Sequence, residues 1–504
     1  MLGADIFRQV EMTMTSKSSV AVIGAGLAGL TSALILARNG RKVTLIEKST
    51  RVGLTVRGFS RQGVYFDTGL HYTGGLGEGG IVRRYMKYLG MDDLKTVAFS
   101  GNCFDEIRFA DTGRIVRLPV GYEPMVNALC EAFPEEREAI VGYMGAARAD
   151  FSNSSLLSFF LDAQKGVQAS GVRTSLTQYL NDITQNEYLR TSLSIHALLH
   201  GVSPDEISFT QHAYVTASYF DSAHNFAGGG RALIEAFERR LREEGVTVVL
   251  GNGVRRIVCD KGNRLTSLLL EDGTEVPADA CISTTHPAAL AEMAADAFRP
   301  SYVEYLRGLE DTVTAYMLFG IVDEKPAPLR GNNLYLCRDP HMIQAFAADA
   351  VPEHGPFYIA TCPQPEDATK WGVVVVAPGT FEGVSPWLDS RLGVRPKEYK
   401  EFKANTLQRI RDAIVGMCPE LAAVRFVDCA SPLTMRDYLS APHGGLYGCK
   451  HSIHQFNPLP FTRISNLWLA GQSVIAPGLM GAMISAFLAC GFLVGHSTLQ
   501  KEIS

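Results

Sequence analysis

The chain has 504 residues, of which 46% are hydrophobic and 20% are charged, and its formal net charge is −5. This length is too great for one hydrophobic core and predicts two or three packed units. The slight negative charge gives no reason to expect a nucleic-acid partner. Ten cysteines are scattered without a CxxC pair, which favours neither a zinc site nor a disulfide framework. We expect reduced, mostly buried thiols in a cytoplasmic protein.

The N-terminal part of the sequence predicts a βαβ unit. Residues 1–18 mix charged and apolar side chains without the apolar core of a secretory signal, and we expect a flexible extension there. The apolar run 20–23 suits a buried parallel strand. A helix over 27–39 follows and stops at Gly40, and residues 42–46 suit a second strand.

Beyond this unit, helical and extended patterns alternate. Residues 58–69 (GFSRQGVYFDTG) predict a hairpin, and residues 81–220 carry apolar side chains at helical spacing, so we expect them to be mainly helical. An amphipathic helix over 231–245 leads into strands over 246–284 whose glycine turns are typical of a small antiparallel meander. Residues 290–435 alternate strands with helices.

The strongest motif is the glycine fingerprint GAGLAG between the first strand and the helix. Gly24 permits a tight turn, Gly26 lets the backbone approach a pyrophosphate, and Gly29 allows close packing of helix on strand. The helix N-terminus presents free N–H groups and a positive dipole end to the phosphates. Glu47 lies roughly 20 residues on, where a carboxylate can bind a ribose. The motif predicts a dinucleotide site, without deciding between FAD and NAD.

Two other stretches have simpler interpretations. The segment from Gly75 through Gly77 to Gly80 repeats the glycine spacing, but it follows a polar stretch and lacks a strand that ends in an acid, so we expect a loop. Residues 476–494 are apolar enough to raise the question of a membrane span. Because this stretch opens with Pro477 and contains several glycines, we favour a helix buried beside the cofactor.

These features together resemble a family of FAD-dependent enzymes. The block GAGLAGLTSALILARNGRKVTLIEK, followed by RVG and by GVYFDTGLHYTGG, is similar to the start of the family that includes phytoene desaturase, carotenoid isomerase and retinol saturase. That family shares its fold with the flavin amine oxidases. Three later blocks resemble it in the same order: GGG before a helix, VLGNGVRRI with EDGTEVPADACISTTHP, and LWLAGQSVIAPGLMGAMISAFLACG. The resemblance spans nearly the whole chain and implies FAD as the cofactor.

Pattern and resemblance predict an α/β fold. We expect a Rossmann-type FAD-binding domain, in which a parallel sheet carries an antiparallel meander, plus a discontinuous α+β substrate domain. The FAD-binding domain would take residues 19–80, 221–289 and 436–504. The substrate domain would take residues 81–220 and 290–435.

The resemblance also implies which residues hold FAD. In addition to Gly24, Gly26, Gly29 and Glu47, it places these residues at the cofactor: Ala25, Leu27, Ala28, Lys48, Arg51, Val52, Arg57, Val254, Gly471, Gln472, Pro477, Gly478, Leu479 and Met480. Arg51 would approach the phosphates, Val254 would offer its backbone to the adenine, and Gly471 with Gln472 would reach the ribityl chain. The helix N-terminus at 477–480 would stabilise the reduced flavin through its dipole.

Two positions depart from the family pattern. Gly53 is followed by Leu54 where a second glycine is usual, so the backbone there would approach the flavin less closely. Gln472 stands where the family has an acid, although its amide can still hydrogen-bond ribityl hydroxyls.

His71 and Tyr72 are the candidates for catalytic residues, because the resemblance brings their loop towards the flavin ring. An imidazole titrates near neutral pH and can act as acid or base. The alternative is a pair of side chains that hydrogen-bond the loop or the flavin without moving protons. His443, His451 and His454 suggest a polar patch near the C-terminal segment, and we expect His451 and His454 to lie in a solvated loop. No metal site is predicted.

The resemblance implies desaturation, saturation or isomerisation of carbon–carbon double bonds in a long apolar polyene or isoprenoid-like substrate. Two alternatives stay open: a flavin amine or amino-acid oxidase, and a non-enzymatic escort for prenyl lipids or prenylated proteins. The apolar stretch 155–161 (SLLSFFL) suits either a core helix, which we favour, or a substrate mouth on a membrane surface. The sequence does not determine the oligomeric state.

Overall fold

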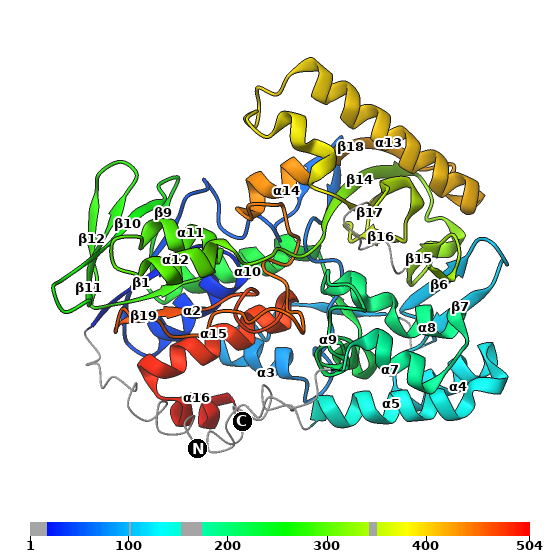
Figure 1. The fold of residues 1–504 in the computed structure, drawn as a ribbon, viewed down its shortest axis with the longest axis horizontal. Coiled ribbons are helices and arrows are strands. Elements are labelled where there is room, and N and C mark those ends of the chain that lie inside the picture. The colour runs from blue at the N-terminus through cyan, green and yellow to red at the C-terminus, as the bar shows by residue number, and fades with distance from the viewer. Residues whose placement is uncertain (1–17, 100–101, 153–173, 342–349, 504) are drawn as a thin grey trace.

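The computed structural model describes residues 18–99, 102–152, 174–341 and 350–503. Two large sheets organise these residues, a parallel sheet in one half of the molecule and a mixed sheet in the other (Figure 1). Almost all of the predicted N-terminal extension lies outside the described residues. So does the stretch 155–161, which we considered for membrane contact.

The first half is built on a five-stranded parallel sheet. In spatial order its strands are β19 (Leu467–Leu469), β13 (Ala280–Ser283), β1 (Ser19–Ile23), β2 (Lys42–Glu47) and β9 (Thr247–Leu250). Side chains alternate across a strand, so Val20 and Val22 face one side of β1 while Ala21 and Ile23 face the other. All four are at most 3% exposed. Both faces of the sheet are buried there, as the uninterrupted apolar run predicts.

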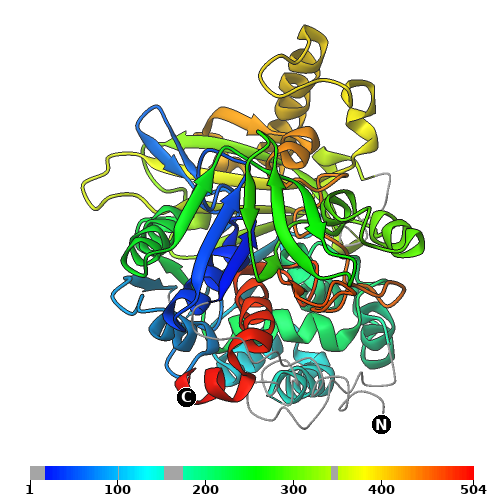
Figure 2. The same ribbon diagram turned by 90° about the vertical axis from the view of Figure 1, so that its left-hand side faces the viewer.

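Helices cover one face of this sheet, and the meander lies on the other. The helices that pack with Val20 and Val22 are α2 (Leu27–Arg38), α3 (Ile81–Tyr88), α10 (Gly229–Glu243), α15 (Gly478–Val494) and α16 (His496–Ile503). The opposite face carries α11 (Pro287–Met293), α12 (Pro300–Arg307), β10 (Val254–Cys259), β11 (Leu265–Leu270) and β12 (Glu275–Pro277). Figure 2 shows the three meander strands in front of the parallel sheet.

The βαβ unit formed by β1, α2 and β2 agrees with the sequence prediction to within one or two residues. The meander is shorter than we expected. The segments at its two ends, β9 and β13, instead pair in the parallel sheet, next to β2 and β1 respectively. A sequence pattern of short strands and glycine turns cannot show which sheet each strand joins.

The second half is built on a seven-stranded mixed sheet. In spatial order its strands are β18 (Arg425–Ala430), β14 (Thr314–Val322), β17 (Trp371–Gly379), β16 (Phe357–Cys362), β15 (Asn333–Cys337), β6 (Asp105–Phe109) and β7 (Ile115–Leu118). The pair β15 and β6 is parallel, and the other neighbours are antiparallel. Its helices are α4 (Tyr122–Ala132), α5 (Arg137–Ser152), α7 (Leu176–Ile183), α8 (Glu187–Ser194), α9 (Phe209–Asp221), α13 (Lys397–Met417) and α14 (Pro432–Leu439).

The remaining elements are short. A hairpin joins β3 (Phe59–Arg61) to β4 (Val64–Phe66), and a second antiparallel pair joins β5 (Thr96–Ala98) to β8 (His224–Phe226), which is distant in the chain. The 3₁₀ helices are η1 (Pro134–Glu136), η2 (Ile195–Leu199), η3 (Ala327–Leu329), η5 (Pro352–His354), η6 (Glu382–Trp387) and η7 (Pro419–Leu421). The pair β3 and β4 confirms the predicted hairpin at 58–69.

Residues 81–220 are less helical than we expected, because they contain β5, β6 and β7. The first two residues of β6 are Asp105 and Glu106, which are polar, yet both are buried in the mixed sheet. A strand that opens with two acids lacks the apolar pattern by which strands are found in sequences.

Most of the apolar stretch 476–494 forms helix α15. Its side chains are buried from Gly481 to Leu493, and it packs against α2 and α3 inside the molecule. Among the described residues we find no helix that is both long and apolar enough to cross a bilayer.

Candidate functional site

The turn between β1 and α2 has the geometry that a dinucleotide phosphate requires. Gly24 has φ +94°, a conformation that glycine adopts without strain. A Cβ atom on Gly29 would lie 1.8 Å from the carbonyl oxygen of Gly24, so only glycine lets the helix pack this closely on the turn. A Cβ atom on Gly26 would meet no atom within 4 Å. The space beside Gly26 is therefore open where a pyrophosphate would lie.

Glu47, at the end of β2, is bound to this turn. Its Oε2 accepts a hydrogen bond from the backbone N–H of Ala25 at 2.8 Å, and its Oε1 accepts one from Ser49 at 2.8 Å. Among the described residues, no side chain caps the N-terminus of α2, whose N-cap is Gly26. The unpaired N–H groups of the first turn, next to Leu27 and Ala28, are thus available to an anion. These residues fit the ADP part of FAD.

The other residues implied along the N-terminal segment have different surroundings. Lys48 and Arg51 are exposed, while Val52 is buried in the core. Arg57 donates to the carbonyl of Val52 and forms an ion pair with Glu238 on α10, so its charge is already partnered. Val254 begins β10 and is half-buried.

The C-terminal segment forms a second glycine turn before α15. Gly471 has φ +117° and donates its N–H to the hydroxyl of Ser485 at 2.7 Å. Gly478 has φ +81° at the start of α15, and no side chain in the described part of the chain caps this helix, whose N-cap is Pro477. The helix N-terminus therefore leaves its first N–H groups free, as the prediction for a flavin edge requires.

A cavity of about 680 Å³, part of it open to solvent, joins this helix N-terminus to the loop after His71. It is lined by Thr73, Phe151, Leu199, Gln211, Tyr214, Val215, Ser218, Tyr219, Ile475, Ala476, Pro477, Gly478, Leu479, Met480, Gly481 and Ile484. None of these residues is charged. The cavity brings together two predicted segments, the loop beside Tyr72 and the residues 477–480.

The two catalytic candidates differ in their hydrogen bonding. Burial lowers the pKa of His71 to about 4, so the imidazole is neutral at pH 7. Within the part of the chain that the structure describes, its ring has no hydrogen-bond partner. Tyr72 donates its hydroxyl proton to Asp105 Oδ2 at 2.8 Å, and burial together with Asp105 raises its pKa well above the usual value. The Tyr72 hydroxyl is therefore fixed by its hydrogen bond to Asp105, which lies on β6 of the mixed sheet.

Asp105 organises a buried polar network that the sequence did not reveal. Besides Tyr72, its carboxylate contacts His196 Nε2 at 2.8 Å and accepts a bond from the Asn333 amide at 2.9 Å. The Tyr72 hydroxyl also contacts the hydroxyl of Tyr335 at 2.9 Å. The histidine inside the apolar run IHALL was the available signal, but its carboxylate partner, Asp105, lies 91 residues before it.

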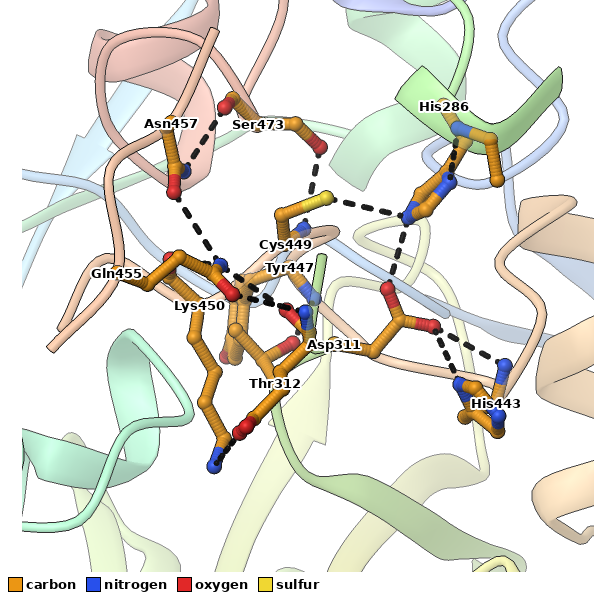
Figure 3. A network of polar contacts seen from close by, with 12 residues as sticks. His286, Asp311, Thr312, His443, Tyr447, Cys449, Lys450, Gln455, Asn457 and Ser473 are labelled. Atoms are coloured by element: carbon orange, nitrogen blue, oxygen red, sulfur yellow. Dashed lines mark hydrogen bonds and ion pairs between the residues drawn. The ribbon is translucent and has the colours of Figure 1, made fainter. Parts of the chain in front are cut away.

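A second polar cluster lies where the chain crosses between the two sheets (Figure 3). Asp311 precedes β14, and Cys449 lies on the return path from α14 to β19. The two residues face each other in an isolated antiparallel bridge. His286, which follows β13, donates from Nε2 to Asp311 at 2.8 Å and lies 3.4 Å from the Cys449 sulfur.

His286, Asp311 and Cys449 bring three types of metal-ligating atom within 4.8 Å of one another. The hydrogen bonds favour a different interpretation. The other ring nitrogen of His286, Nδ1, accepts the N–H of Ala288, so the ring proton is on Nε2. Burial raises the pKa of Cys449 to about 12, so its sulfur is a neutral thiol. The three residues therefore form a hydrogen-bonded clasp between the crossing segments.

The three C-terminal histidines lie in different surroundings. His443 is exposed, and its backbone N–H donates to Asp311 at 3.0 Å. His454 is exposed, as expected. The expectation that His451 is solvated was wrong: it is 8% exposed, and its Nε2 lies 2.6 Å from the carbonyl oxygen of Gln472. His451 thus holds the turn that the resemblance assigns to the ribityl chain.

Comparisons with known proteins agree with this geometry. The chain is 25% identical over 535 residues to human all-trans-retinol 13,14-reductase, a match that covers 97% of this chain and 87% of the relative. It is 21% identical over 481 residues to 4,4'-diapophytoene desaturase of Staphylococcus haemolyticus, covering 90% and 94% of the two chains. The structure of an oxidoreductase from Methanosarcina mazei superposes with a TM-score of 0.66 at 15% identity, covering 93% of this chain and 99% of that one.

The likeness to retinol saturase and carotenoid desaturases thus extends over the full length of the chain, as the sequence motifs predicted. The family model for the flavin containing amine oxidoreductases matches residues 27–372, which is most of the chain. The chain belongs to the flavin-containing amine oxidoreductase family.

Proposed function

We propose that the protein is an FAD-dependent oxidoreductase that acts on carbon–carbon double bonds of a long apolar polyene or isoprenoid-like substrate. The observation that carries the proposal is the cavity at the N-terminus of α15, whose lining among the described residues contains no charged side chain. Transfer of an apolar chain from water into such a cavity is favourable. A charged substrate would instead lose its hydration and find no opposite charge in the described lining. The full-length relationship to a retinol reductase and a carotenoid desaturase supports the same class of substrate.

The phosphate turn and Glu47 would hold the ADP part of the cofactor, and the α15 N-terminus would lie beside the flavin ring. When bound, FAD supplies the hydride acceptor and donor for such a reaction. The residues of this chain then bind the polyene along α9 and exclude water from it. The Tyr72 hydroxyl, fixed by Asp105 and Tyr335, keeps the loop beside the cavity in place.

The two alternatives receive less support. An amine or amino-acid substrate would be recognised by a carboxylate or guanidinium in the cavity, and the described lining provides neither. A non-enzymatic escort has no need for a phosphate-binding turn, yet a Cβ on Gly26 would meet no atom within 4 Å and Glu47 binds the turn.

An anaerobic substrate screen tests the proposal. The FAD-loaded protein is mixed in its oxidised and its reduced form with a panel of polyenes, prenyl lipids and amines, and the flavin absorption is followed. We expect a spectral change with at least one polyene or prenyl lipid and with no amine. Bleaching by an amine together with no response to any polyene would overturn the proposed substrate class.

A further inference from the structure

The loop 449–457 holds the turn that follows β19 by its backbone carbonyl groups. His451 donates from Nε2 to the carbonyl oxygen of Gln472 at 2.6 Å, and the Asn457 amide donates to that of Ser473 at 2.9 Å. Figure 3 shows the Asn457 amide directed at Ser473. Two successive carbonyl groups of the turn are therefore fixed by side chains of one loop.

The ring of His451 is used entirely for this contact. A carbonyl oxygen only accepts hydrogen bonds, so the ring proton is on Nε2, towards Gln472. The other ring nitrogen, Nδ1, lies 3.3 Å from the Asn457 amide, which donates to it. Burial lowers the pKa of His451, so the ring is neutral at pH 7. A side chain that is 8% exposed and hydrogen-bonded at both nitrogens keeps its partner in one position.

The turn 471–473 lies at the same edge of the parallel sheet as the glycine turn after β1. Strands β1, β13 and β19 are parallel neighbours, and their last residues, Ile23, Ser283 and Leu469, are paired side by side. Ligands of such sheets bind beyond the carboxyl ends of the strands. The turn 471–473 is therefore at the edge where a dinucleotide binds.

The loop 449–457 is also tied to the half of the molecule that forms the cavity. Lys450 Nζ lies 3.1 Å from the Glu206 carboxylate and 3.0 Å from that of Glu310. The backbone N–H of Ile453 donates to the carbonyl of Glu206 at 2.7 Å. Glu206 precedes α9, whose residues line the cavity, and Glu310 precedes β14 of the mixed sheet. The loop therefore fixes the place of the turn relative to the cavity.

Gln472 offers a cofactor a neutral amide, whose hydrogen bonds are weaker than those of a carboxylate. The affinity for FAD then depends more on how well the turn is ordered before the cofactor binds. We propose that His451, together with Asn457, is a positioning residue that holds the turn 471–473 in the conformation that binds FAD. The inference rests on the FAD site of the proposed function and is independent of the substrate class. His451 acts through Gln472 and transfers no proton.

The dissociation constant of FAD measures the role of His451. FAD is titrated into the FAD-free full-length protein, and the change in flavin fluorescence is followed. His451→Phe keeps a ring and removes the donor. We expect it to weaken FAD binding about two- to tenfold, because one neutral hydrogen bond contributes on that scale. His451→Gln, whose amide N–H can donate in place of Nε2, should restore most of the affinity.

A second substitution and a control make the test specific. Asn457→Leu removes the other donor and should weaken FAD binding to a similar extent, so the inference can be tested even if His451→Phe does not fold. His454→Phe is the matched control, because His454 is an exposed histidine of the same loop. This control should retain the affinity of the wild-type protein for FAD.

The Tm of the FAD-free variants separates positioning from a purely structural role. A lowered Tm with an unchanged dissociation constant for FAD, in both His451→Phe and Asn457→Leu, would overturn the inference and leave the FAD site intact. The same conclusion would follow if His451→Gln bound FAD as weakly as His451→Phe. A wild-type protein that takes up no FAD would instead overturn the proposed function together with the inference.

Discussion

Glu47 is the residue on which the nucleotide site depends most directly. Its two carboxylate oxygens accept hydrogen bonds from the backbone N–H groups of Ala25 and Ser49, so it shapes the glycine turn. Hydrogen bonds to a charged group contribute about 1.5–3 kcal/mol, and we expect Glu47→Ala to weaken FAD binding about ten- to a hundredfold. Flavin content after dialysis measures the effect. Glu304→Ala, at an exposed position of α12, is the control and should retain FAD. Normal FAD content in Glu47→Ala would place the cofactor elsewhere.

His71 permits a distinction between proton transfer and binding. A histidine whose pKa is about 4 is almost wholly unprotonated at pH 7, so it has almost no imidazolium proton to donate. We therefore expect His71→Ala to change the kcat for an accepted polyene little, with FAD still bound. Steady-state kinetics with an accepted polyene checks this. A fall of kcat by about 10² or more would instead assign proton transfer to His71.

At the scale of elements, the turn between β1 and α2 allows the same substitution to be made at two glycines with opposite expected results. A Cβ on Gly26 meets open space, so Gly26→Ala should fold with an unchanged Tm but lose FAD, because the methyl group occupies the space of the pyrophosphate. A Cβ on Gly29 lies 1.8 Å from the Gly24 oxygen, so Gly29→Ala should lower the Tm of the FAD-free protein itself. Thermal unfolding with and without FAD measures both. The account would be contradicted if the FAD-free Gly26→Ala protein had a Tm as low as that of FAD-free Gly29→Ala.

The sequence was most informative where an element and its partners are neighbours in the chain. The phosphate turn, α2 and Glu47 lie within about 25 residues, so spacing alone located them. Asp105 could not be found in this way, because its partners His196 and Asn333 come from distant elements that meet only in the folded mixed sheet. The clasp of His286, Asp311 and Cys449 could not be found from the sequence for the same reason, because its three residues also come from distant segments. His451 lies in a loop rich in polar residues, and nothing in that pattern indicates that its side chain is buried against the carbonyl oxygen of Gln472.

At the scale of the whole molecule, buried neutral histidines predict sensitivity to acid. Burial lowers the pKa of His71 to about 4, that of His212 to about 3 and that of His200 well below the usual value. In the unfolded chain each would take up a proton near pH 6.5, whereas in the folded protein it cannot. Their contribution to stability is therefore complete above about pH 6.5 and is lost as the pH falls towards 4.

Asp67 acts in the opposite sense. Burial raises its pKa to about 6, so its contribution to stability is complete below the unfolded value and is lost as the pH rises through 6. Burial also lowers the pKa of His224 and His451 and raises that of Asp221. Because histidines with a lowered pKa outnumber carboxyls with a raised one, we expect the free energy of unfolding to fall between pH 7 and pH 5. Urea unfolding at the two pH values measures it, and equal or greater stability at pH 5 would contradict the burial of these histidines.

The central claim is that the glycine turn at Gly26, Glu47 and the N-terminus of α15 together hold one FAD. The direct test is the stoichiometry of flavin released by denaturing the purified or FAD-reconstituted full-length protein. We predict a yellow protein that releases one FAD per chain. A colourless protein that takes up no FAD on reconstitution would contradict the account.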